Sequence, residues 1–69
     1  MIPSISYTKN ANKSFPFVNR EQAEGMVTFC NEYFMARELE CYAEVWDVGD
    51  WWTVRIVEHD HVMFIKDVE

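Results

Sequence analysis

The segment Glu58-His59-Asp60-His61 places two imidazoles and two carboxylates within four positions, and all of these side chains can bind zinc. A metal site needs three or four ligands that converge, and two histidines two positions apart in a turn do not supply them. We therefore expect a solvated turn here, with no metal and no cofactor. The alternative of a small metal-binding protein depends on His59 and His61 alone.

Cys30 and Cys41 are the two residues that carry a nucleophilic thiol. Both stand on the apolar faces of the elements expected to hold them, and a thiol buried among apolar side chains is inert. The chain also lacks a glycine-rich phosphate-binding loop and a nucleophile elbow. The sequence therefore predicts no catalytic residue, and a protein that is not an enzyme.

Three tryptophans surround one turn in the segment VWDVGDWWTV, residues 45–54. Neighbouring residues of a strand point to opposite faces, so Trp51 and Trp52 cannot both be core residues. We expect a turn that pairs Trp46 with Trp51 on an outer face and places Trp52 on an inner face. The outer face would then carry Tyr42, Glu44, Trp46, Trp51, Arg55, Val57, Val62, Phe64 and Lys66. The inner face would carry Leu39, Cys41, Ala43, Val45, Trp52, Val54, Ile56, Met63 and Ile65.

The elements that must position these residues form a β-α-β-β-β order. Residues 5–8, 39–46 and 51–58 alternate as strands do, and a turn at residues 58–61 leads into a further strand and pairs Val57 with Val62. Residues 20–38 have the apolar spacing of a helix, with Asn19 as its N-cap. Its polar arc carries Glu21, Glu24, Thr28, Asn31 and Glu32. We expect an α+β fold in one domain, residues 1–69, with one helix packed on one face of an antiparallel sheet.

One helix cannot cover both faces, so the outer face becomes a large apolar patch unless Phe15, Phe17 and the amino-terminal segment fold over it. An uncovered aromatic patch is typical of a partner site or a homodimer interface, where Trp, Tyr and Arg dominate the binding energy. Residues 21–69 hold all 12 acidic side chains, and the net charge is −6. This charge favours a basic partner and speaks against direct binding of nucleic acid, whose phosphates bind Lys and Arg.

The residues expected to bind a partner are Tyr42, Glu44, Trp46, Trp51, Arg55 and Phe64 on the sheet and Glu21, Glu24 and Glu32 on the helix. In size, charge and compactness the chain resembles the small acidic proteins that phages and mobile elements encode to inhibit host nucleic-acid enzymes. That resemblance implies a basic protein partner, possible imitation of nucleic acid, and a cytoplasmic location in the host cell. Residues 1–10 lack the apolar run of a signal peptide, and no run reaches the ~20 residues of a membrane span. The alternative is an obligate homodimer with an accessory or structural role.

Overall fold

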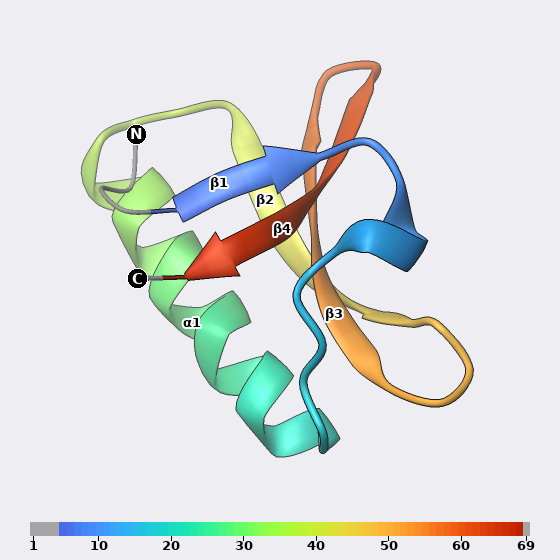
Figure 1. The fold of residues 1–69 in the computed structure, drawn as a ribbon. Helices are drawn as coiled ribbons and strands as arrows, with labels where there is room; N and C mark the ends of the chain where they lie inside the picture. The colour runs from blue at the N-terminus through green and yellow to red at the C-terminus, as the bar shows by residue number, and fades with distance from the viewer. Residues whose placement is uncertain (1–4, 69) are drawn as a thin grey trace.

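The computed structural model describes residues 5–68 and has four strands, one short 3₁₀ helix and one α-helix (Figure 1). In chain order these are β1 (Ile5–Thr8), η1 (Ala11–Lys13), α1 (Arg20–Ala36), β2 (Cys41–Asp47), β3 (Trp52–Glu58) and β4 (His61–Val68). The strands form one antiparallel sheet in the order β1-β4-β3-β2, with α1 packed against β2 and β3. The predicted α+β fold is confirmed. Positions 1–4 and 69 of the expected domain lie outside the described residues.

Helix α1 begins as the sequence predicts and ends two residues earlier. The Asn19 side chain caps it by accepting a hydrogen bond of 2.9 Å from the backbone N–H of Gln22. At the other end, Leu39 N–H donates to Phe34 O (2.9 Å) and Glu38 N–H donates to Met35 O (3.1 Å), the two bonds of a Schellman cap. Glu38 occupies the left-handed position of that cap with φ of 55°, where glycine is usual. The expected helix end at residue 38 is therefore wrong. The sequence gives no sign of the end at Ala36, because the left-handed position that follows it holds Glu38 instead of a glycine.

The expected pairing of Trp46 with Trp51 is also wrong. Trp46 lies opposite Thr53 and Asp47 opposite Trp52, so Trp51 belongs to the four-residue loop 48–51. Hydrogen bonds within the loop fix its length: the Asp47 carboxylate accepts the Gly49 N–H at 2.7 Å, and Val48 N–H donates to Trp51 O at 3.0 Å. The resulting shift of two residues keeps every strand residue on its expected face, because side chains alternate with a period of two. The expected β3–β4 register, with Val57 opposite Val62, is confirmed.

The segment that carries Phe15 and Phe17 lies beside the sheet and bonds to the backbones of β3 and β4. It does so at the end of the sheet where β4 pairs with β1 and no longer with β3. Phe17 exchanges backbone hydrogen bonds of 2.8 and 3.0 Å with Trp52, and Phe15 N–H donates to Ile65 O at 2.7 Å. Both phenyl rings join the core under the helix, so the alternative in which they cover the outer face is not realised. The buried residues of that core are Phe17, Ala23, Cys30, Phe34, Ala43, Val54, Ile56 and Ile65.

Three expected inner-face residues are less buried than a core requires. Trp52 packs against the core but is only partly buried, and Met63 is partly exposed. Leu39 follows the end of α1 and is 42% exposed. The core is therefore centred on the middle of the strands and thins toward both ends of the β2–β3 pair, with Trp52 at the end where β2 finishes and Leu39 at the end where β2 begins.

Candidate protein-interaction surface

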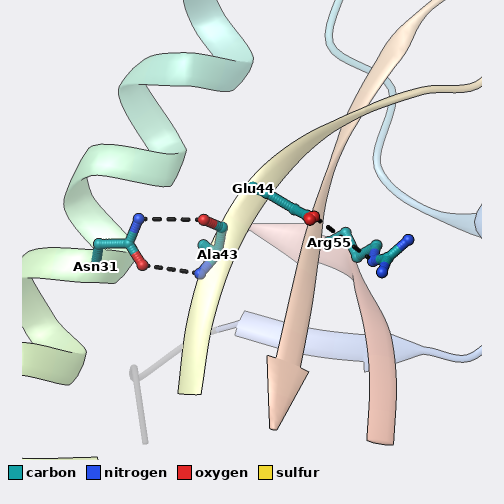
Figure 2. Close-up of polar contacts among 4 residues, drawn as sticks. All are labelled: Asn31, Ala43, Glu44 and Arg55. Atoms are coloured by element: carbon teal, nitrogen blue, oxygen red, sulfur yellow. Dashed lines mark hydrogen bonds and ion pairs between the residues drawn. The ribbon is translucent and has the colours of Figure 1, made fainter. Parts of the chain in front are cut away.

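The outer face of the sheet is built from rows of side chains that cross β2, β3 and β4. One row is Tyr42, Val57 and Val62, and the next is Glu44, Arg55 and Phe64. Trp46 and Thr53 begin a third row, and these eight residues are called the outer face from here on. Figure 2 shows that Glu44 and Arg55 project from the strands on the side away from α1.

The exposed apolar part of the outer face consists of Tyr42, Trp46 and Val62, which are 52%, 36% and 37% exposed. Phe64 and Thr53 are buried although α1 covers the opposite face of the sheet. The Trp46 ring lies over Phe64, with a centroid separation of 6.1 Å and a tilt of 59°. The outer face is thus a layered surface, with Phe64 beneath Trp46, rather than a flat sheet of exposed rings.

Arg55 is the charged centre of the outer face. Its guanidinium carbon lies 4.5 Å from the centroid of the Trp46 ring, which is cation–π geometry. Its Nε lies 3.9 Å from a carboxylate oxygen of Glu44, an ion pair too long for a hydrogen bond, and this Nε atom is buried without a hydrogen-bond partner. Arg55 and Phe64 both pack against the Trp46 ring, and packing of this kind lowers the conformational entropy that a side chain loses when a partner binds.

The structure divides the residues expected to bind a partner into two groups. Tyr42, Glu44, Trp46, Arg55 and Phe64 come together on the outer face, whereas Trp51 lies in the β2–β3 loop and is partly buried. Glu21, Glu24 and Glu32 are exposed on α1, which covers the opposite face of the sheet. One flat partner surface therefore cannot contact both groups at once.

The carboxylate of Glu24 differs from the other two because it has a partner. It lies 2.8 Å from Nε of Arg20, whose guanidinium carbon lies 5.6 Å from the Trp52 ring centroid. An exposed pair of this kind is worth about 0.5 kcal/mol, but it reduces the local negative field of the helix. Glu21 and Glu32 are the carboxylates of this group that carry the uncompensated charge.

Sequence reasoning missed the role of Asn31, which it placed on the solvated arc of the helix. The Asn31 side chain donates from Nδ2 to Ala43 O at 3.1 Å and accepts from Ala43 N–H through Oδ1 at 2.8 Å (Figure 2). Strand β2 is an edge of the sheet, and free edges invite pairing with other chains. The Asn31 amide occupies both backbone groups of one residue of that edge, so a partner cannot add a strand there. The one signal in the sequence was a side chain that both donates and accepts, placed beside the apolar stripe.

The thiols are not activated. Burial raises the pKa of Cys30 to about 11, with a further contribution from Cys41. Burial and the Glu58 carboxylate raise the pKa of Cys41 above its ordinary value. Nucleophilic cysteines have lowered pKa values because the thiolate is the reactive form. Within residues 5–68, His, Cys, Asp and Glu side chains form no group of three or more that could hold a metal ion.

The chain matches no protein-family model, and neither curated proteins nor solved structures give a significant match. Among the described residues, no helix is long and apolar enough to cross a membrane.

Proposed function

We propose that this protein is a non-enzymatic interaction protein that binds a larger partner with a basic surface and inhibits or regulates it. The proposal depends on one observation above all: Tyr42, Trp46 and Val62 are exposed on the sheet face opposite the one that α1 covers. Exposed aromatic residues beside an arginine form the typical centre of a protein interface.

The packing of the side chains within the outer face supports contact with a partner. Phe64 lies beneath Trp46, and Arg55 stacks against the same ring. A partner that docks there meets a preformed surface and loses little binding free energy to ordering it. The Asn31 clamp on β2 favours docking on this face over addition of a strand at Ala43.

The acidic residues favour a partner with a basic surface, because together they give the protein a negative electrostatic field. The net charge of −6 attracts a positive surface over a distance set by the Debye length, about 8 Å at physiological ionic strength and about 30 Å at 0.01 M. Glu21 and Glu32, on the side away from the outer face, would therefore act on the encounter at low salt, whereas Glu44 would act at the contact itself.

The first experiment captures partners from a lysate of the source organism on immobilised protein. We expect Trp46→Ala and Tyr42→Ala to reduce capture of a specific basic protein, whereas Met35→Ala, at a residue 78% exposed on the helix, retains it. With the purified partner, truncation of Trp46 should cost about 2 kcal/mol or more and act mainly on the dissociation rate. The captured protein must also lose or change its own activity when bound.

The second experiment measures association rates at low and physiological salt. Neutralising Glu21, Glu24 and Glu32 together should slow association at low salt and have little effect at physiological salt. If this triple variant instead abolishes binding while the Trp46 and Tyr42 variants bind normally, the helix is the contact surface, as imitation of a phosphate row would require. Sedimentation of the free protein tests the homodimer: a dimer that Trp46→Ala dissociates would assign the outer face to a second copy.

A further inference from the structure

The inner face of the sheet has an uncovered end. Helix α1 stops at Ala36, while β2 and β3 continue to the pair of Cys41 and Glu58. A hollow of about 320 Å³ lies there, within the size range of small-molecule sites. Its lining is mainly apolar and consists of Tyr7, Phe34, Leu39, Ile56 and Met63, together with Cys41 and Glu58.

The fold fixes the walls of this hollow from several sides. The Schellman cap holds Leu39 beside Phe34 through the 2.9 Å hydrogen bond from Leu39 N–H to Phe34 O. Phe34 and Ile56 are core residues, and Tyr7 extends from β1 at the far edge of the sheet. The hollow is therefore formed by packed elements and does not depend on a single loop.

Glu58 gives the hollow its charge. It lies directly opposite Cys41 across the β2–β3 ladder, and its carboxylate is close enough to contribute to the raised pKa of the Cys41 thiol. Within residues 5–68, no Lys, Arg or His side chain lies within ion-pair distance of Glu58, although Lys9 and His61 line a neighbouring depression with it. Among residues 5–68, the apolar hollow thus ends at an exposed carboxylate that has no ion-pair partner.

We propose that this hollow binds a small organic cation with an apolar body, an alkyl or aryl amine whose ammonium group pairs with Glu58. The aromatic and aliphatic walls would hold the body, and the ammonium group would remain at the rim beside the carboxylate. The net negative charge of the protein raises the local concentration of such cations. This site is independent of the outer face and of the partner proposed above.

The test uses n-octylamine as the probe, with 1-octanol and octanoate as neutral and anionic comparators, on protein labelled with ¹⁵N. We expect saturable amide shifts for n-octylamine at Leu39, Cys41 and Glu58, and at least fivefold tighter binding than for octanoate. An ion pair partly exposed at a rim accounts for a difference of this size. Bound n-octylamine should also slow alkylation of Cys41.

Glu58→Gln separates the charge from the hollow. This exposed, isosteric change should weaken n-octylamine about fivefold and leave 1-octanol unchanged. Glu40→Gln should change neither, because Glu40 does not line the hollow and faces His59 at 3.6 Å. Absence of saturable shifts, equal binding of n-octylamine and octanoate, or shifts centred on Trp46 would each overturn the proposal. Trp46→Ala should leave n-octylamine binding intact, so failure here is distinguishable from failure of the outer-face proposal.

Discussion

The clamp of Asn31 on the backbone of Ala43 yields the sharpest prediction about stability. Asn31→Ala removes two hydrogen bonds, of 3.1 and 2.8 Å, to a residue that is only 5% exposed. Each such bond contributes about 0.5–1.5 kcal/mol, so the clamp contributes about 1–3 kcal/mol. A domain of this length has a free energy of unfolding of roughly 5 kcal/mol, so the loss should be large.

Urea unfolding measures the loss, and Thr28→Ala is the matched control. Thr28 is exposed one turn earlier on α1, and its replacement gives a similar gain in helix propensity, so the difference between the variants isolates the clamp. Amide exchange at Ala43 should accelerate in Asn31→Ala. In Asn31→Asp the carboxylate still accepts from Ala43 N–H, so protection of that amide should persist. Equal stability of the two alanine variants, with unchanged exchange at Ala43, would refute the reasoning.

Three further predictions test the fold. Trp52→Ala should cost about 3 kcal/mol in circular-dichroism melts, because Trp52 packs against the core, and Trp51→Ala in the loop should cost less; the reverse order would contradict the strand register. Glu38→Gly should raise the free energy of unfolding by about 1 kcal/mol, because glycine adopts φ of 55° without strain, whereas the control Glu40→Gly should not raise it. Burial in the folded protein raises the pKa of the Cys30 thiol from an ordinary 9.0 to about 11. The stability that the buried neutral thiol contributes is therefore fully present below pH 9 and is lost as the pH rises from 9 to 11. At pH 10 the unfolding free energy of the wild type relative to Cys30→Ala should be lower by about 1 kcal/mol than at pH 8, and a difference that does not change with pH would contradict the raised pKa of this thiol.

The sequence predicted the faces of the strands better than their pairing. Alternation alone assigns Tyr42, Trp46 and Arg55 to one face and Ala43 and Val54 to the other, and the structure agrees. The pairing depends on the length of the β2–β3 loop, and two-residue differences in that length leave the alternation unchanged. Contacts inside the loop, such as the hydrogen bond between Asp47 and Gly49, fix its length. The alternation pattern of the strands carries no information about these contacts.

Burial on the outer face was beyond sequence reasoning for a related reason. A strand pattern says which way a side chain points, but it does not say which neighbour leans over it. Phe64 and Thr53 point away from the helix and are nevertheless buried, and the ring over Phe64 belongs to Trp46 on another strand. The hydrogen bonds of Asn31 could not be predicted for the same reason, because their partner is the backbone of a residue twelve positions away.

The separation of the acidic helix from the aromatic face changes how the two surfaces can act together. A single contact patch of rings and carboxylates would make charge and hydrophobic burial inseparable in any variant. Here the helix stands on the other side of the sheet, so Glu21 and Glu32 cannot touch a partner docked on Trp46, and salt screens the field that they exert on it. In the proposed complex their field would guide the approach of a basic partner, and the short-range binding energy would come from Tyr42 and Trp46 and from the charges beside them. Because Glu44 lies 3.9 Å from Arg55 within the outer face, it is the carboxylate through which a partner's positive charge could compete for the existing ion pair, and it links the two effects.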